Sequence, residues 1–181
     1  MYEGIPKEAI TRMWEKYSEQ KRYVEKWKDD YGYGVSCKML FTNATDRTVY
    51  RGQTVSIFMG KKTDDKKVYF FPSISPGETL TAFHAKRDGA AVGCGGAMEF
   101  YLEGLKDQPW WAVGWKVPYS GANATDSQVA TCAEVSKYLE RSHVGGDSST
   151  TFLHHGTYRL DTLMSPGTTA VHHIILRKVN E

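Results

Sequence analysis

The chain has 181 residues, of which 40% are hydrophobic, 24% charged and 13% aromatic, and its formal net charge is +2. This composition is too apolar for a disordered chain and too varied for a fibrous repeat. The small net charge creates no long-range field that would favour a nucleic-acid partner, and no apolar run approaches the ~18 residues of a membrane-spanning helix. We therefore expect a soluble globular protein with a single domain, residues 1–181.

Residues 6–31 are predicted to form an amphipathic helix that can detach from the rest of the domain. Pro6 suits the first helical turn, and the glycines that follow residue 31 would end the helix. One face of this helix would be apolar and the other dense in Lys, Arg and Glu, so the helix could either lie on lipid or cover a sheet. Large apolar residues recur at the spacing of one helical face: Ile10, Met13, Trp14, Tyr17, Val24 and Trp27.

After residue 34 the apolar residues recur at a spacing of two, which indicates a series of strands. The segments are short, β-branched and aromatic, and turn clusters such as TNATD, KKTDD and SPGE separate them. The predicted strands are residues 35–43, 47–59, 67–71, 78–84, 90–102, 110–117, 150–154, 157–163 and 170–179.

A second helix is predicted over residues 126–141, with Asp126 or Ser127 as its N-cap. Its buried face would carry Val129, Cys132, Val135 or Ser136, and Leu139. Strands before and after this helix, together with the helix at the start of the chain, define the fold class. We expect a mainly β protein, a β-sandwich of about ten strands flanked by two α-helices.

Residues that often bind metals or carry catalysis are present, but their spacing matches no known site. In a strand, the pairs His154-His155 and His172-His173 would each place only one imidazole on a given face. The run GAAVGCGGA lacks the GK[ST] ending of a phosphate-binding loop, and the cysteines form no CxxC pair. We therefore expect no enzyme activity, no metal and no cofactor.

The segment WWAVGWKVPY concentrates aromatic residues in one predicted strand. Alternation places Trp111, Val113 and Trp115 on one face of the strand and Trp110 on the other. Trp and Tyr suit the interface between water and a bilayer, where the ring is buried and its polar atom stays wet. They equally suit the core of a sandwich, and both interpretations remain open at this point.

Several motifs together resemble the actinoporins, a family of pore-forming cytolysins. The stretch FPSISPGETLTAFHAKRDGAAVGCGGAMEFYL is similar to a family segment with a Pro-containing turn, an RDG-like turn and a Gly-rich strand, a match carried by Arg87, Asp88, Gly89 and Gly93. The stretch WWAVGWKVPYSG resembles the family strand that ends in a Val-Pro-aromatic motif at a membrane-facing loop. CAEVSKYLE resembles the family's second helix, and AVHHIILRKV resembles its last strand.

The resemblance implies a β-sandwich with a helix on each side that binds phosphocholine lipids, sphingomyelin in particular, through exposed aromatic residues. The protein would be a monomer in solution and a homo-oligomer on the membrane, where the N-terminal helix inserts to form a pore. It would be secreted and act on a target-cell membrane. The start, MYEGIPKEAI, is not a signal peptide, so a cytoplasmic location is the alternative. The implied lipid contacts are Trp115, Val117, Pro118, Tyr119 and Tyr138.

The alternative function is a lectin-like or lipid-headgroup binding module on the same fold, without pore formation. The loop SGANATDSQ carries no aromatic residue, whereas the family builds a headgroup pocket from Tyr and Trp there. Ala133 and Lys137 stand at positions where the family helix has tyrosines, and the first helix is highly charged. Two sequons, Asn43-Ala-Thr45 and Asn123-Ala-Thr125, are predicted to be exposed, and a glycan at Asn123 would oppose membrane docking.

Overall fold

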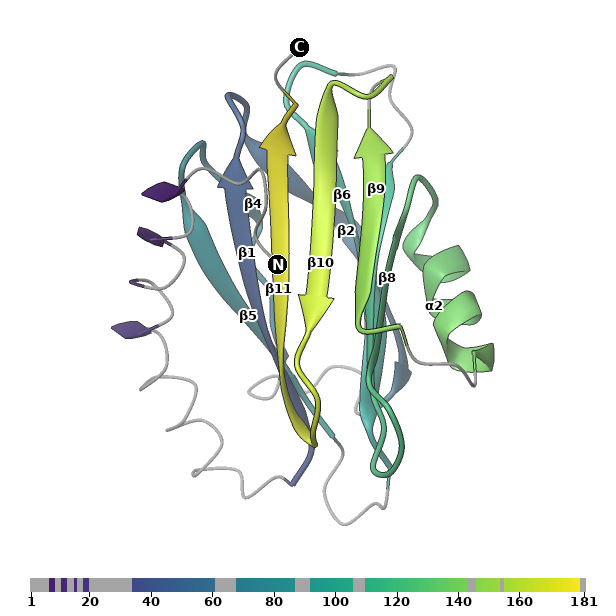
Figure 1. The fold of residues 1–181 in the computed structure, drawn as a ribbon. Helices are drawn as coiled ribbons and strands as arrows, with labels where there is room; N and C mark the ends of the chain where they lie inside the picture. The colour runs from purple at the N-terminus through teal and green to yellow at the C-terminus, as the bar shows by residue number, and fades with distance from the viewer. Residues whose placement is uncertain are drawn as a thin grey trace.

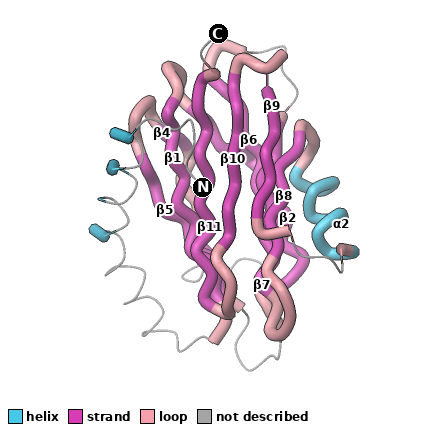
Figure 2. Tube along the Cα trace, viewed as in Figure 1, coloured by secondary structure: helices cyan, strands magenta, loops and turns pink. Residues whose placement is uncertain are grey.

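The computed structural model describes residues 7–8, 11–12, 15, 18–19, 34–60, 68–86, 92–105, 110–142, 146–153 and 155–179. Eleven strands in these ranges form two sheets that face each other, and helix α2 lies against the outer side of one sheet (Figure 1). Strands make up most of the described chain (Figure 2). The predicted mainly β sandwich is therefore confirmed.

The first sheet has six strands in the order β3-β5-β1-β11-β10-β9. The first and last strands of the chain, β1 and β11, are parallel neighbours in this sheet, and its other pairs are antiparallel. This sheet therefore forms only when both ends of the strand series are in place. The bounds are β1 Ser36–Ala44, β3 Val68–Tyr69, β5 Thr79–Ala85, β9 Ser148–Leu153, β10 Tyr158–Met164 and β11 Thr169–Lys178.

The second sheet has five antiparallel strands in the order β4-β2-β6-β7-β8. Strand β2 is irregular between Arg51 and Val55, where its register against β6 shifts. Such a bulge bends a strand and increases its twist. Strands β4 and β8 lie outside the predicted strands. The bounds are β2 Val49–Met59, β4 Ser73–Ile74, β6 Cys94–Leu102, β7 Trp111–Val117 and β8 Ala124–Gln128.

The main core lies between the two sheets and is rich in aromatic rings. Phe100 of β6 is 4.8 Å from Phe41 of β1 and 4.8 Å from Trp111 of β7, measured between ring centroids. Trp111, Val113 and Trp115 all point into this core, as the period-two spacing predicts. For these two tryptophans the core interpretation is confirmed.

Helix α2, Cys132–Arg141, covers the opposite face of β7, which the sequence left open. Small residues make this possible, because Ala112 and Gly114 point outward and form a shallow strip under the helix. A Cβ at Gly114 would stand 2.7 Å from Val135 Cγ1 and would also collide with Leu139 Cδ1. Only glycine therefore allows α2 to approach the sheet this closely.

Helix α2 begins later than predicted. Its N-cap is Thr131, whose Oγ1 accepts a hydrogen bond from the Glu134 amide at 3.3 Å, while Glu134 Oε2 accepts from the Thr131 amide at 2.8 Å. This capping box starts the helix at Cys132. The predicted N-caps, Asp126 and Ser127, lie in strand β8 instead.

Strand β8 has no apolar alternation because its inward side chains bury hydroxyl groups. Thr125 Oγ1 donates to the Gly114 carbonyl at 3.0 Å and lies 2.7 Å from His172 Nε2. Ser127 Oγ lies 3.0 Å from Ser149 Oγ of β9. Buried hydroxyls are stable when they are hydrogen-bonded, so these contacts join the two sheets along their β8 and β9 edges.

The described positions of the N-terminal segment are helical and exposed, and they are Lys7, Glu8, Thr11, Arg12, Glu15, Ser18 and Glu19. They recur at the spacing of one face, so they match the polar face of the predicted helix. Arg12 approaches the turn between β4 and β5, where its Nη1 lies 3.2 Å from the place of a Cβ on Gly77. The predicted apolar face lies outside the described residues. No helix within the described ranges is long and apolar enough to cross a membrane.

Candidate functional site

The basal end of the sandwich comprises Lys86, Val92, Pro118 and Tyr119, at the point where β5 and β7 finish and β6 begins. In Figure 1 it is the lower end, where β10 also finishes and β11 begins. Strand β7 stops before Pro118 because proline has no amide hydrogen for the ladder. A Cβ at Gly93 would stand only 2.6 Å from Pro118 Cα, so glycine is needed for the two segments to meet.

The basal end exposes apolar side chains beside a cation. Tyr119 is 55% exposed and Val92 is 41% exposed. Lys86 Nζ lies 5.8 Å from the centroid of the Tyr119 ring, within the range of a cation–π contact. The structure thus exposes Tyr119 as predicted and adds Lys86 and Val92. Sequence reasoning missed these two because they lie far from Tyr119 along the chain.

Helix α2 is held toward the basal end by a lysine from β7. Lys116 Nζ donates to the carbonyl of Leu139 at 2.9 Å and to the carbonyl of Ser142 at 2.7 Å. A cation here satisfies free carbonyls at the helix C-terminus and interacts favourably with the helix dipole. Since Lys116 nearly adjoins Pro118 in sequence, this link brings the last turn of α2 close to the basal loops. That turn presents Tyr138, which is 56% exposed.

The solvent-facing side of α2 carries charges of both signs and one aromatic ring. Lys137, Glu140 and Arg141 are exposed near Tyr138, and Ala133 and Glu134 are exposed one turn earlier. In the described part of α2 and the basal end, Tyr119 and Tyr138 are the exposed aromatic residues. A choline cage needs several ring faces around one point. A tyrosine with a cation beside it, as in Tyr119 with Lys86, instead suits the phosphate of a lipid headgroup.

Two of the predicted lipid contacts are buried. Trp115 and Val117 are both 0% exposed and belong to the core between the sheets. Trp115 Nε1 donates to His84 Nδ1 at 2.9 Å, so its polar atom is satisfied inside the protein rather than by water. The structure therefore places these residues in the core, and Pro118, Tyr119 and Tyr138 are the predicted contacts that reach the surface.

The prediction that both sequons are exposed is wrong. Asn43 is 0% exposed and donates from Nδ2 to the Ile74 carbonyl at 3.0 Å. Asn123 is 8% exposed and donates from Nδ2 to the carbonyls of Ser165 and Gly167, each at 2.8 Å. Each of these asparagine side chains is hydrogen-bonded to the backbone of another segment and so joins two parts of the chain. Asn123 thereby fastens the loop after Pro118 to the turn between β10 and β11, which stiffens the basal end.

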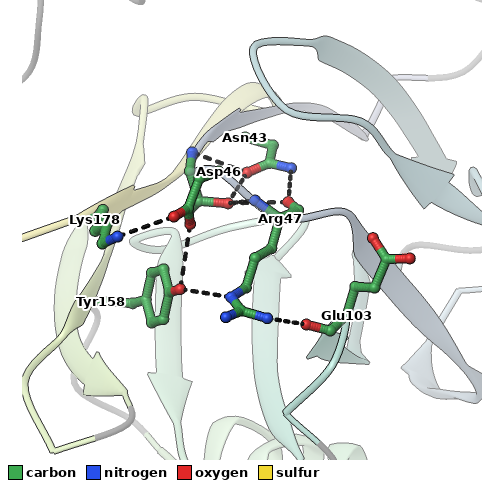
Figure 3. Close-up of polar contacts among 7 residues, drawn as sticks. Asn43, Asp46, Arg47, Glu103, Tyr158 and Lys178 are labelled. Atoms are coloured by element: carbon green, nitrogen blue, oxygen red, sulfur yellow. Dashed lines mark hydrogen bonds and ion pairs between the residues drawn. The ribbon is translucent and has the colours of Figure 1, made fainter.

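The opposite end of the sandwich is closed by a polar network (Figure 3). Lys178 Nζ lies 2.9 Å from Asp46 Oδ2, and the Tyr158 hydroxyl donates to Asp46 Oδ1 at 3.3 Å. Arg47 Nε donates to the Tyr158 hydroxyl at 3.0 Å, and its Nη1 donates to the Glu103 carbonyl at 2.9 Å. The hydrogen bond from Lys178 lowers the pKa of Asp46. These contacts link both sheets, so we interpret this network as structural.

Buried histidines and cysteines offer little chemistry. Burial lowers the pKa of His172 to about 3, so its imidazole is neutral, and its Nε2 is hydrogen-bonded to Thr125 Oγ1. The cysteine side chains are free thiols and are buried, and burial raises the pKa of each: Cys37, Cys94 and Cys132. Within the described ranges no three potential ligands cluster in a way that could hold a metal ion. His154 lies outside the described residues, and His155 is exposed in a turn.

No protein-family model matches the sequence, and a comparison with curated proteins found no match. Solved structures do resemble the fold. The lipid-binding protein Nakanori matches with a TM-score of 0.68 and 19% identity, over 89% of this chain and 80% of that chain. The RahU protein, crystallised with TRIS, matches with a TM-score of 0.51 and 13% identity, over 82% of this chain and 98% of that chain. The Xerocomus chrysenteron lectin XCL matches with a TM-score of 0.44 and 10% identity, over 78% and 99% of the two chains.

At these identities the likeness concerns the fold alone. The chain has a β-sandwich shared with a lipid-binding protein, and this is consistent with the actinoporin-like fold that the sequence motifs suggest. The residues that carry the family resemblance do not all lie in the described part of the chain. Gly93 and the Val117-Pro118-Tyr119 motif lie together at the basal end, whereas Arg87, Asp88 and Gly89 lie outside the described residues.

Proposed function

We propose that this protein binds phospholipid membranes through its basal end and the last turn of α2. The observation that carries the proposal is the exposed Tyr119 ring with the Lys86 Nζ 5.8 Å from its centroid, at the end of the sandwich where Val92 is also exposed. Tyrosine and valine would enter the headgroup region, and the lysine would meet a lipid phosphate. Tyr138 would extend the contact along α2.

The expected affinity of one molecule is modest. Tyr119, Tyr138 and Val92 are each about half covered already, so their further burial is worth about 1 kcal/mol each. Lys86 would add about 1 kcal/mol near an anionic surface, whereas Glu134 and Glu140 offset Lys137 and Arg141 on α2. The sum of about 4 kcal/mol corresponds to a Kd of about 1 mM, and without anionic lipid the affinity is severalfold weaker.

Sedimentation with vesicles tests the proposal directly. Vesicles of phosphatidylcholine alone, with sphingomyelin, and with phosphatidylserine would distinguish choline recognition from a general attraction to phosphate and negative charge. Tyr119→Ala should weaken binding about fivefold, because it removes the ring that inserts and the partner of Lys86.

Phe152 provides a matched control, because it is 58% exposed and its ring centroid lies 5.9 Å from the Arg159 guanidinium, yet it lies on β9. Phe152→Ala should bind vesicles like the wild type. Equal losses in Tyr119→Ala and Phe152→Ala would contradict a site at the basal end, as would wild-type binding by both variants.

Pore formation is a separate proposal that rests on the N-terminal helix. After docking, residues 6–31 would detach, insert and assemble with other copies, and the charged face described above would line water because charges in the bilayer core are costly. Dye release run beside sedimentation on the same vesicles separates the two functions. Release that Trp14→Arg abolishes, with binding retained, would support a pore. Binding without release from any vesicle would leave a recognition module.

A further inference from the structure

A second exposed aromatic cluster lies on the outer face of the five-stranded sheet, away from the basal end. We name it the indole shelf, and it consists of Tyr50 of β2, Tyr101 of β6 and Trp110, which directly precedes β7. Tyr50 pairs with Tyr101 across the strands, and Phe100 pairs with Trp111, so the three residues form one row across neighbouring strands. Tyr101 is 38% exposed and Trp110 is 44% exposed.

The rings of the indole shelf form a floor and a wall. Tyr50 and Tyr101 are stacked, with centroids 5.3 Å apart and ring planes 21° apart. Trp110 meets Tyr101 at 4.8 Å with an interplanar angle of 70°. The tyrosine pair is therefore the wall, and the indole beside it is the floor.

Gly52 of β2 is what allows the indole to form a floor. A Cβ at this position would stand 2.9 Å from Trp110 Cζ3 and 3.0 Å from Glu99 Cβ. Since β6 separates β2 from β7, the Trp110 side chain must reach across β6 to approach Gly52. One side of the indole thus rests on the sheet while the ring remains 44% exposed.

This geometry suits a pyranose ring. The apolar C–H face of a hexose stacks on an exposed aromatic floor, and the hydroxyl groups at its rim bond to polar groups beside that floor. The phenol groups of Tyr50 and Tyr101 can both donate and accept hydrogen bonds. Glu99 stands on the same face of β6, and its carboxylate is held in place because Oε1 accepts from the Cys132 amide at 2.8 Å. Strands carry Tyr50, Glu99 and Tyr101, and Trp110 directly precedes β7, so most of the site stands on a rigid framework.

Other occupants fit this patch less well. The exposed parts of Tyr101 and Trp110 amount to about 200 Å² together, well below the ~800 Å² per partner of a standard protein interface. The indole rests on the sheet instead of projecting, and the carboxylates of Glu99 and Glu103 would oppose contact with a bilayer. The stacked tyrosines cover each other's faces, so they do not form the cage of open faces that a quaternary ammonium needs.

We propose that the indole shelf binds a neutral hexose or N-acetylhexosamine unit of a glycan. The shelf lies toward the end of the sandwich where Arg47 contacts the Glu103 carbonyl, opposite the basal end. A molecule docked on lipid by its basal end would therefore still present the shelf to a glycan. This site stands independently of the proposed lipid contact, and either can exist without the other.

Saturation-transfer NMR on the full chain tests the site with named probes. These are the methyl glycosides of glucose, galactose, mannose, N-acetylglucosamine and N-acetylgalactosamine, followed by calorimetric titration of those that bind. The expected Kd for a single stacked sugar is about 1 mM. Trp110→Ala should weaken binding about tenfold or more, and Gly52→Ala should weaken it by lifting the floor. Trp110→Phe should keep part of the affinity, and Tyr119→Ala should bind like the wild type.

Each variant is first checked for the wild-type circular dichroism spectrum, and Trp110→Ala should pass because the residue is exposed and precedes its strand. The proposal is overturned if none of the five sugars binds, or if sugar binding persists in Trp110→Ala. It is equally overturned if tetramethylammonium or phosphocholine, and no sugar, binds in a manner that requires Trp110. Loss of vesicle binding in Trp110→Ala would reassign the shelf to lipid.

Discussion

Replacing Trp115 by phenylalanine tests whether this residue stabilises the core or contacts lipid. In the structure its indole is 0% exposed, and its Nε1 donates to His84 Nδ1 at 2.9 Å. The ring also lies 5.8 Å from Phe70 and 5.6 Å from His84, measured between centroids. Trp115→Phe keeps an aromatic ring at this site but removes the donor and part of the volume.

The expected loss follows from these contacts. His84 Nδ1 would become a buried acceptor without a partner, which costs about 1–3 kcal/mol. The smaller ring would leave a cavity worth about 1 kcal/mol. The free energy of unfolding should therefore fall by about 2–4 kcal/mol, a large share of the 5–15 kcal/mol that is usual for a folded domain. For a chain of this length the melting temperature should fall by about 4–16 °C.

Urea unfolding followed by far-UV circular dichroism measures this loss without relying on tryptophan emission. At a temperature where the variant is fully folded, Trp115→Phe should bind vesicles like the wild type. Wild-type stability combined with loss of vesicle binding would refute the core assignment and restore Trp115 as a lipid contact. A stability loss under about 0.5 kcal/mol would show that the hydrogen bond to His84 contributes little.

Acid should destabilise the fold, because burial lowers the pKa of three histidines to about 3 or 4, namely His84, His172 and His173. Their contribution to stability is complete above pH 6.5 and is lost as the pH falls toward the lowered pKa, because only the unfolded chain then takes up protons. The loss amounts to about 1.4 kcal/mol per pH unit for each histidine. A urea midpoint that stays constant from about pH 7 to pH 4 would contradict this. Gly114→Val should cost about 1–3 kcal/mol by pushing α2 off the sheet, and it should weaken vesicle binding that depends on Tyr138; unchanged unfolding would rule out the close approach of α2. The buried thiols should react with iodoacetamide near pH 8 only as fast as the protein unfolds, so rapid labelling of the native protein, detected by mass spectrometry, would show an open thiol.

Alternation of apolar residues predicted the long strands and their faces. In β7 it placed Trp111 and Trp115 on one face, and both are in the core. It failed for β8, because Thr125 and Ser127 bury hydroxyls that are hydrogen-bonded to other strands and so carry no apolar signal. It also failed for the start of α2, where the capping box at Thr131 decides the boundary.

The candidate site was predictable only in part. The motif around Pro118 and Tyr119 was visible in the sequence, but Lys86 joins it through the tertiary fold. Alternation places Trp115 and Trp110 on opposite faces of one strand, but nothing local indicates which face is exposed. The fold buries the first against His84 and leaves the second exposed over Gly52.

The amino-acid sequence by itself determined the local conformations and the apolar faces, because these depend on backbone propensity and on a spacing of two or about four residues. Only the tertiary structure decided which strands are neighbours, as in the parallel pairing of β1 with β11 from opposite ends of the strand series. It also decided which polar groups are buried, such as Asn43 and Asn123. The physical reason is that a buried amide or an exposed ring depends on partners far away in the chain, which no local pattern encodes.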